Sequence, residues 1–518
     1  MTKIQSLERE VKDWKIKYSN LETKSKDAIK DREYLYSVIQ KMDIKIDNLT
    51  NEVNELKKEN KELKCKLEKA NVTIDTLKAR LKKDSSNSSK PPSSDGFKKK
   101  IHSSREKTGR KPGGQKGHKG ATLKLYDEPT SVVECVCDEK CDCGGNIEYN
   151  NEFTFRKQKI DIKIITEITE YHTFKGHCMK CNREYTTQFP EGINNLVQYG
   201  ENLKTIVSLM LNEGMVSVQR TKDIIYGLTS GNVKLSGGTI ININNELAKK
   251  SQPIIEEIKK YLIESELLFV DETGVRIDGK LNWLHTACTK DTTLYMVDKK
   301  RGSTATENMG ILASYVGVLM HDHLKAYYNY STMTHAECNA HILRYLKSII
   351  DIFKREEAQE LLNFLIEINN EKKKAIESEQ ESFSSEYLEK KEAQYLKILS
   401  DWKSKYEEAI AGKKNISYYN DEKCLIARLF EFKDEHLRFI YDFNVPFDNN
   451  LAERALRMIK TKTKVSGGFR SDIGGENFAK IRSVIDTVKK RNLNLVEFLN
   501  NLFLTKSVTL NQKQVNAL

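Results

Sequence analysis

The amino-acid sequence predicts a multidomain protein of the α+β class, and three observations lead to this prediction. Its 518 residues exceed the size of one compact domain. The first eighty residues carry a seven-residue apolar repeat typical of long paired helices, whereas short apolar runs at residues 267–270 and 316–320 are typical of buried strands. Six of the ten cysteines lie between Cys135 and Cys181, which indicates a small unit of its own.

The charge and composition narrow the functional class. The formal net charge of +12 favours polyanionic partners such as nucleic acid, although a basic surface without a dedicated partner gives the same value. No apolar run is long enough to cross a bilayer and the N-terminus has no apolar signal region, so we expect a cytoplasmic protein with no membrane partner. In a reducing compartment, clustered cysteines indicate metal binding before disulfides.

Residues 1–83 are predicted to form a coiled-coil oligomerisation helix. The apolar pattern runs from Ile4 to Leu81, and such a stripe is buried against a partner helix. Asn60 occupies a core position, where a polar residue fixes the register and favours dimers. The pattern weakens from Ser25 to Arg32, so we expect a break there. The sequence favours a homodimer, and the alternative is a helix that folds back on its own chain.

Residues 84–127 are predicted to be a disordered basic arm. The segment begins with DSSNSSKPPSSDG, whose Ser, Pro and Gly residues neither continue a helix nor form a core. Residues 98–124 hold ten Lys or Arg against one acid, which suits salt-sensitive contact with DNA phosphates, although a solvated linker is the alternative. The candidate DNA-binding residues here are Lys98, Lys99, Lys100, Arg110, Lys111, Lys116 and Lys119.

Residues 128–195 are predicted to form a zinc-binding, ribbon-like domain in which two cysteine pairs hold one structural Zn²⁺. The stretch between the pairs, residues 153–171, alternates as a strand does. The first pair has a one-residue gap instead of the usual two, so Cys137 or Cys135 could replace Cys141, and a ribbon that has lost its metal is the alternative. The expected ligands are Cys141, Cys143, Cys178 and Cys181.

Residues 196–262 are predicted to form a helical, helix-turn-helix-like DNA-binding region. Apolar faces at residues 206–211, 217–226 and 239–247 are separated by glycine-containing breaks. The last of these helices is the one expected to enter a major groove. Small helical bundles without DNA contact share this pattern and are the alternative.

Residues 263–345 are predicted to form the first part of an α/β catalytic core. Leu267–Val270 is a buried-strand run that ends in Asp271, and Val316–Met320 is another that leads to Asp322. Aspartates at the ends of adjacent strands converge at one edge of a sheet, where ligands bind. Further strands are expected over residues 281–289 and 292–297, and a helix over residues 303–312.

A third carboxylate lies in residues 441–500, the expected C-terminal part of the core. Asp448 is a good N-cap for a helix that carries Glu453. Converging carboxylates from Asp271, Asp322 and Glu453 suit Mg²⁺ or Mn²⁺. Two such ions activate an attacking water or 3′-hydroxyl and stabilise the leaving oxygen, so we expect these three residues to be both metal ligands and catalytic residues.

Each carboxylate also has a structural alternative. Asp271 could be a turn residue at a strand end, with Glu272 as a rival ligand, although strand alternation points the Glu272 side chain elsewhere. Asp322 could cap the next helix. Glu453 could pair with Arg457 one helical turn further on.

Other polar residues near the carboxylates are candidate DNA contacts. Because His335, Cys338 and His341 lack a standard zinc spacing, we favour His341 and Arg344 as groups that contact phosphate or support the site. Residues 346–440 form a predicted helical insertion, which either clamps DNA or serves as a scaffold, and residues 501–518 form a tail. The DNA-backbone candidates downstream of Glu453 are Lys460, Lys462, Lys464 and Arg470.

Seven segments, in order along the chain, resemble those of the IS66 family of transposases. They are SSNSSKPPSSDG, GRKPGGQKGHKG, the cysteine unit from Cys141 to Cys181, VDETGV, Asp322 with AYY at 326–328, CNAHILR, and DNNLAERALR followed by GGFRS. The resemblance implies a DDE transposase core of RNase H-like fold, in which Asp271, Asp322 and Glu453 bind two Mg²⁺ ions. It also implies cleavage and transfer of double-stranded DNA, binding of terminal inverted repeats by the N-terminal half, and accessory proteins of the same element.

Two points qualify this prediction. Asn339 stands where the family usually has Trp, a change that we expect to affect local packing only. The rival functions are an RNase H-like nuclease that hydrolyses without strand transfer, and a catalytically idle, coiled-coil DNA-binding regulator. The presence of all three carboxylates argues against the idle protein.

Overall fold

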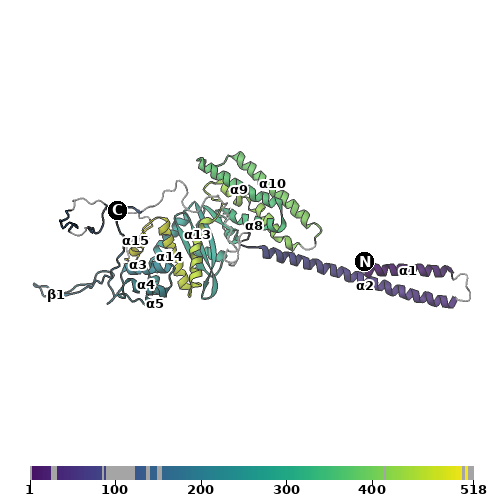
Figure 1. Ribbon diagram of the computed structural model, residues 1–518, viewed down its shortest axis with the longest axis horizontal. Coiled ribbons are helices and arrows are strands. Elements are labelled where there is room, and N and C mark those ends of the chain that lie inside the picture. The colour runs from purple at the N-terminus through teal and green to yellow at the C-terminus, as the bar shows by residue number, and fades with distance from the viewer. Residues whose placement is uncertain are drawn as a thin grey trace. The chain divides into compact units, whose positions relative to one another are not determined.

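The structure is a computed structural model, and it describes residues 3–24, 32–84, 87–88, 123–135, 140–148, 155–413, 416–504 and 508–510 (Figure 1). The chain divides into two units: residues 1–100 with 335–448, and residues 101–334 with 449–518. The N-terminal helices and the predicted insertion therefore belong to the same unit. Over the described ranges, no helix has both the length and the apolar character that spanning a membrane requires.

In the first unit, α1 (Lys3–Lys24) packs antiparallel against the first half of α2 (Arg32–Lys82), as Figure 1 shows. Leu7 and Val53 are buried between the two helices, because the apolar stripes of both face each other. The break predicted from Ser25 to Arg32 falls on residues 25–31, which lie outside the described residues. The first half of the repeat thus folds back on its own chain, which was the alternative to pairing between chains.

The second half of α2 leaves its apolar stripe exposed. The exposed fraction is 62% at Leu67 and 86% at Leu81, and Leu63, Ile74 and Leu77 are also exposed. This end of the helix contacts the short helix η5 (Ser417–Tyr419) of the same unit, with Val72, Thr76 and Ala79 half-buried. The face that docks within the chain is therefore not the face that carries the seven-residue repeat.

The described residues between 339 and 441 are mainly helical, as predicted for the insertion. Trp402 is fully buried, and its Nε1 donates to Oε1 of Glu422 at 2.8 Å. Arg355 donates to both oxygens of Glu422, at 2.6 and 3.2 Å, so the buried carboxylate has two partners. The helices are α8 (Asn339–Phe353), α9 (Glu356–Glu377), α10 (Ser385–Ile410), α11 (Asn420–Glu431) and α12 (Lys433–Tyr441).

In the second unit, four helices precede the main sheet, and the first three match the predicted apolar faces. They are α3 (Glu201–Asn212), α4 (Val218–Leu228), α5 (Gly237–Lys250) and α6 (Gln252–Ile263). Ser217 and Ser236 cap α4 and α5 by accepting backbone N–H hydrogen bonds from Arg220 and Thr239. These caps end each glycine-containing break and start the next helix.

The main sheet is mixed, with strand order β5-β4-β3-β6-β7 over the described residues. β3 pairs antiparallel with β4 and parallel with β6, and β4 pairs antiparallel with β5. The strands predicted over residues 281–289, 292–297 and 316–320 agree with β4, β5 and β6 within two residues, whereas β3 is longer than the predicted strand at 267–270 and α7 is shorter than the predicted helix at 303–312. The elements are β3 (Leu267–Ile277), β4 (Lys280–Cys288), β5 (Thr293–Asp298), α7 (Ser303–Met309), η3 (Leu312–Ser314), β6 (Val318–His321), η4 (Lys325–Asn329) and β7 (Thr334–Glu337).

Three C-terminal helices complete this unit: α13 (Asn450–Ser466), α14 (Asp472–Lys490) and α15 (Leu495–Phe503). α13 packs on β3 and β4, and α14 packs on β5 (Figure 1). Hydroxyl groups of α14 bind the backbone of β5, because Ser483 and Thr487 accept from Tyr295 and Thr293 at 2.8 and 3.0 Å. α15 continues to Phe503, so the first residues of the predicted tail are helical.

The strand predicted over residues 153–171 is wrong for its described part, which begins at residue 155. An alternating pattern gives a strand only where a neighbour accepts its hydrogen bonds, and no described segment pairs with this one. The strands of the cysteine unit are instead β1 (Lys175–His177) and β2 (Glu184–Thr186), which pair antiparallel on either side of Cys178 and Cys181.

Candidate active site in the mixed sheet

The register of the sheet brings Asp271 and Asp322 to the same level. The parallel pairing of β3 with β6 ends at Phe269 opposite Met320, and each aspartate lies two residues further along the chain, Asp271 within β3 and Asp322 directly after β6. The prediction that this strand ends at Asp271 is wrong, because β3 continues to Ile277 as one arm of the hairpin with β4. Asp271 therefore lies within a strand, at the point where only one neighbouring strand remains.

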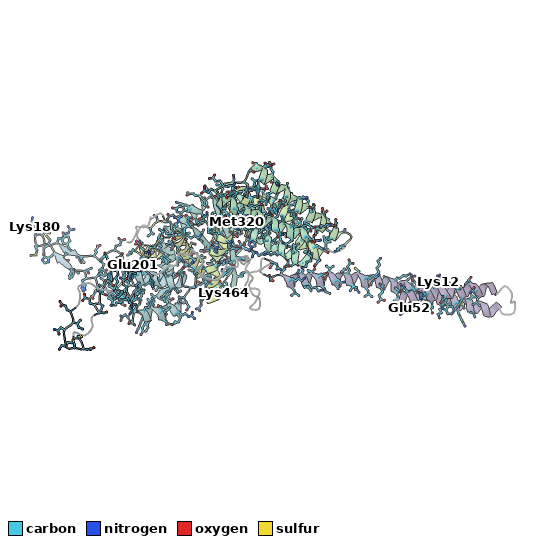
Figure 2. All side chains as sticks on the ribbon, turned by 45° about the horizontal axis from the view of Figure 1, so that its top comes forward. Lys12, Glu52, Lys180, Glu201, Met320 and Lys464 are labelled. Carbon is cyan, nitrogen blue, oxygen red and sulfur yellow. The ribbon has the colours of Figure 1, made fainter. Side chains whose placement is uncertain are left out.

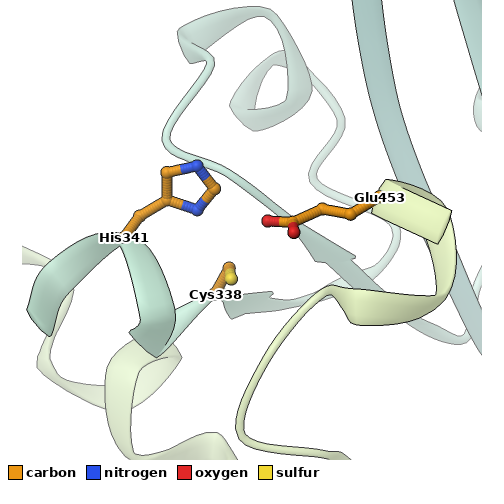
Figure 3. Close-up of side chains that lie close together, drawn as sticks. All are labelled: Cys338, His341 and Glu453. Carbon is orange, nitrogen blue, oxygen red and sulfur yellow. The ribbon is translucent and has the colours of Figure 1, made fainter. Parts of the chain in front are cut away.

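Asn449 links α13 to β3 beside Asp271. Its Nδ2 donates to the carbonyl oxygen of Val270 at 2.8 Å, and the side chain is buried. Glu453 follows in the first turn of α13 (Figure 3), where its backbone N–H donates to the carbonyl of Asn449 at 3.2 Å. The sequence predicted Asp448 as the N-cap of α13, but the N-cap is Asn449. The side-chain amide of Asn449 does not cap the helix, because it donates to the backbone of β3.

The electrostatics of Asp271 indicate a cluster of like charges. Burial is the main cause that raises its pKa to about 8, and the neighbouring carboxylates of Glu272, Asp322 and Glu453 each add to the rise. Charges act in this way only over short distances through a protein interior. Asp322 and Glu453 thus lie near enough to Asp271 for their charges to act on it. Among the described residues, however, the oxygen atoms of the three carboxylates do not all lie within 4.8 Å of one another. Carboxylate oxygens are the donors that a divalent cation such as Mg²⁺ takes from proteins.

Glu272 adds its charge to the environment of Asp271 but has its own hydrogen-bond partners. Its side chain is fully buried, and Oε1 accepts from Nε of Arg301 at 2.8 Å while Oε2 accepts from the hydroxyl of Tyr327 at 2.8 Å. Because both oxygens are occupied, Glu272 is poorly suited to bind a metal. The strand alternation that argued against it as a rival ligand agrees with these bonds.

Asp322 caps the turn that follows it, which was the structural alternative to a role as metal ligand. Its Oδ1 accepts from the backbone N–H of Leu324 at 3.0 Å, in the turn that leads to η4. This bond occupies one lone pair of one oxygen and orients the carboxylate. A ligand role and a turn-capping role are therefore compatible, since a carboxylate has several acceptor positions.

The region around α8 belongs to the first unit. Cys338 directly precedes the helix and His341 lies in its first turn (Figure 3). Burial, together with the charges of Arg344 and Arg428, lowers the pKa of His341 to about 3, so its imidazole is neutral at physiological pH. A neutral ring can hydrogen-bond a phosphate but adds no charge to the contact. Asn339, at the position usually held by Trp, is buried and donates to the carbonyl of His436 at 2.9 Å.

The other predicted DNA contacts differ in their exposure. Lys460, Lys464 (Figure 2) and Arg470 are exposed, as backbone-contacting cations must be. Lys462 is half-buried and lies over the ring of Phe478, and burial lowers its pKa. The candidates in the basic arm lie outside the described residues: Lys98, Lys99, Lys100, Arg110, Lys111, Lys116 and Lys119.

The cysteine pairs each form a turn suited to a metal-bound thiolate. The backbone N–H of Gly145 points to Cys143, that of Lys180 points to Cys178, and these bonds are the main cause that lowers the pKa of each thiol. Cys141 and Cys181 add hydrogen bonds within their own pairs. Within the described ranges, however, no three of the four sulfur atoms lie within 4.8 Å of one another.

The sequence did not predict the roles of three residues near the carboxylates. Arg301 and Tyr327 bind Glu272, and Asn449 binds the backbone of β3. The signal was present only as segments of the family pattern, since Tyr327 belongs to AYY and Asn449 to DNNLAERALR. Nothing in those segments names their partners, which lie far away in the sequence.

The asparagine link leads to a first prediction. Asn449→Ala removes the bond to Val270 and leaves that backbone carbonyl without this partner, so we expect the free energy of unfolding to fall by about 1–3 kcal/mol. The exposed neighbouring change Asn450→Ala is the control and changes it by less than about 0.5 kcal/mol. Equal melting temperatures of the two variants contradict the role of Asn449 in holding α13 to β3.

Comparison with known proteins places this geometry in a family. Residues 197–477, more than half of the chain, match the family described as Transposase IS66 family. Residues 40–124 match a family of unknown function (DUF6444). No curated protein matches the chain. The matched span contains β3, β6 and α13 with their three carboxylates. The chain therefore belongs to the IS66 family of transposases, which are enzymes that cleave DNA.

Proposed function

We propose that this transposase cuts DNA at the terminal inverted repeats of a mobile element and joins the ends to target DNA, with two Mg²⁺ or Mn²⁺ ions bound by Asp271, Asp322 and Glu453. The observation that supports this most is the pKa of Asp271, which is raised by burial and by the charges of Glu272, Asp322 and Glu453. A cluster of this kind gains most from a divalent cation, because the cation offsets the repulsion. The DDE core of RNase H-like fold is part of the same proposal.

The donor chemistry of the site fits hard cations. Carboxylate oxygens are the ligands that Mg²⁺ takes from proteins, and few of them are needed because substrate phosphates and water complete the shell. When bound, the ions activate the attacking oxygen and stabilise the leaving oxygen. The chain itself positions the carboxylates: the β3–β6 register aligns two of them, Asn449 holds α13 next to β3, and Leu324 orients Asp322.

DNA binding by the rest of the chain is part of the proposal. The basic arm from Lys98 to Lys119 supplies sequence-independent contact with phosphates, and the helices α3 to α5 supply readout of the terminal repeats. Lys460, Lys464 and Arg470 are exposed and suit contact with the DNA backbone. His341 and Arg344 of the first unit are further candidate contacts for DNA phosphates, the former as a neutral imidazole. Accessory proteins of the same element are further expected partners.

We propose a homodimer formed through the second half of α2. Leu63, Leu67, Ile74, Leu77 and Leu81 keep the seven-residue spacing and are exposed in the single chain. A row of large apolar side chains at core positions is stabilised by the same row of a second copy. The first half of α2 is already covered by α1, so the contact between chains is narrower than the sequence predicted.

Structural zinc in the cysteine unit is a separate part of the proposal, and we expect one Zn²⁺ per purified chain. One thiol of each pair, Cys143 and Cys178, has a lowered pKa, and one ion bound by all four sulfur atoms joins the two turns. Cys178→Ser is expected to reduce the bound zinc, measured by mass spectrometry of the metal, by at least ~10-fold. Cys65→Ser, at an exposed cysteine of α2, keeps the full amount. Zinc retained by the Cys178 variant excludes that thiol as a ligand.

The experiment that tests the proposed function incubates the full chain with candidate terminal-repeat DNA and Mn²⁺ and measures joining of 3′-hydroxyl ends to a target plasmid. Joined products support transposition chemistry. Cleaved products without joining identify a nuclease, and no product in any metal identifies a DNA-binding regulator. The last two outcomes contradict the proposal.

A further inference from the structure

The unassigned group next to the carboxylates is the guanidinium of Arg301, which follows β5. Its Nε and Nη2 both approach Oε1 of Glu272, at 2.8 and 2.7 Å. Its charged plane lies over the ring of Trp283, 4.8 Å from the centroid. These contacts fix the guanidinium on two sides, which removes most of the entropy that a free arginine loses when it binds a ligand.

The buried carboxylate that holds Arg301 is itself well supported. Tyr327 donates to the other oxygen of Glu272, whose side chain has no exposure. By contrast, 45% of the Arg301 side chain is exposed, and its Nη1 makes no hydrogen bond to any described residue. An arginine needed only to neutralise a buried acid does not require this exposure. One edge of the guanidinium is thus fixed inside and the other edge faces solvent.

Arg301 is also close to the proposed metal ligands. Burial lowers its pKa, but the charge of Glu272 and, to a smaller degree, that of Asp322 raise it above its ordinary value. Glu272, which holds Arg301, directly follows Asp271 in β3, and Tyr327, the other partner of Glu272, lies in η4, the element that follows Asp322. A phosphate that bridges metal ions at those carboxylates therefore has a fixed cation beside it.

We propose that Nη1 of Arg301 binds a backbone phosphate of the DNA strand that is cut, with Glu272, Trp283 and Tyr327 as the residues that position it. This inference rests on the proposed function, since the phosphate is the one held at Asp271, Asp322 and Glu453. A guanidinium fixed by an acid on one edge offers paired N–H donors to phosphate oxygens on the other. Contacts of this kind place the strand without reading its sequence.

The test measures nicking of supercoiled plasmid DNA in Mn²⁺ by the full chain. Arg301→Gln is expected to lower the rate about 100-fold, as the loss of a fixed charge at a reacting phosphate does. Arg301→Lys keeps a cation for Glu272 without the planar fork, and is expected to be about 10-fold slower than the wild type. The matched control is Arg276→Gln, an exposed arginine of β3 that bonds only its own turn, at Gly279, and it leaves the rate within about two-fold.

A double variant separates phosphate binding from simple charge neutralisation. Glu272→Gln with Arg301→Gln leaves no buried charge, and the amide keeps an acceptor for Tyr327. If Arg301 binds phosphate, this variant stays about 100-fold slow while Mn²⁺ still raises its melting temperature as in the wild type. Recovery of the wild-type rate, or loss of the Mn²⁺ effect on melting, overturns the inference.

Failure of the inference and failure of the proposed function give different results. Asp271→Asn is included in the same assay. If that variant is inactive and Arg301→Gln is fully active, only the role of Arg301 is wrong. If Asp271→Asn nicks as fast as the wild type, the carboxylate site is wrong and the inference falls with it.

Discussion

Asp271→Asn is expected to lower Mg²⁺-dependent DNA cleavage by at least ~1000-fold, which corresponds to about 4 kcal/mol of transition-state stabilisation from bound metal. Asparagine has nearly the same shape, but it has one neutral oxygen in place of a charged carboxylate. The fold is expected to remain, because the change removes an acidic group whose ionisation is opposed by burial and by three neighbouring acids. DNA binding stays within about two-fold, since the basic contacts are untouched.

The matched control for this prediction is Asp278→Asn, in the exposed turn between β3 and β4. Asp278 has a φ of 47°, a conformation that asparagine accepts as readily as aspartate, so the control keeps the hairpin. Cleavage of a labelled terminal-repeat duplex measures both variants. Residual activity of Asp271→Asn near the wild-type level removes this residue from the site.

Leu67→Glu is expected to convert the dimer into a monomer and to abolish the joining of paired ends. Leu67 lies at a core position of the exposed stripe, and a charge buried there without a partner costs about 3 kcal/mol, or ~100-fold in the Kd of the dimer. Cleavage at a single end depends on residues of one chain and is expected to persist. Light scattering as a function of concentration measures the change in mass.

Cys65→Glu is the control, because it adds the same charge two residues earlier, on the other side of the helix and at an exposed position. It is expected to leave the dimer intact. A dimer that survives Leu67→Glu, or one that is lost equally in both variants, contradicts pairing through the stripe from Leu63 to Leu81.

Much of the secondary structure could be predicted because its signals are local. The starts of β3 and β6 are short apolar runs, which suffice to predict a strand before Asp271 and one before Asp322, although β3 continues past Asp271 to Ile277. The heptads predicted the helices α1 and α2. They did not predict which stripe would be covered, because an apolar stripe is equally well buried by the same chain or by a second one.

The parts that were missed depend on contacts between distant residues. Asn449 reads as an ordinary helix-start residue, and only the folded chain shows its amide on Val270, 179 positions away. Arg301 stands in a polar turn where a basic residue attracts no notice, and its partner Glu272 is known only from the pairing of strands. Apolar and polar residues alternate over residues 155–171, and this pattern led to the wrong prediction of a strand. A strand also needs a neighbouring strand to pair with, and the pattern gives no information about one.

The central claim is that Asp271, Asp322 and Glu453 share divalent cations, and crystals grown with Mn²⁺ and DNA test it most directly. Anomalous diffraction at the manganese edge locates the ions without reference to activity. We expect a peak within about 2.1 Å of carboxylate oxygens from both Asp271 and Asp322, with Glu453 bound to a second ion beside it. Manganese peaks that leave these three carboxylates without a metal contradict the claim.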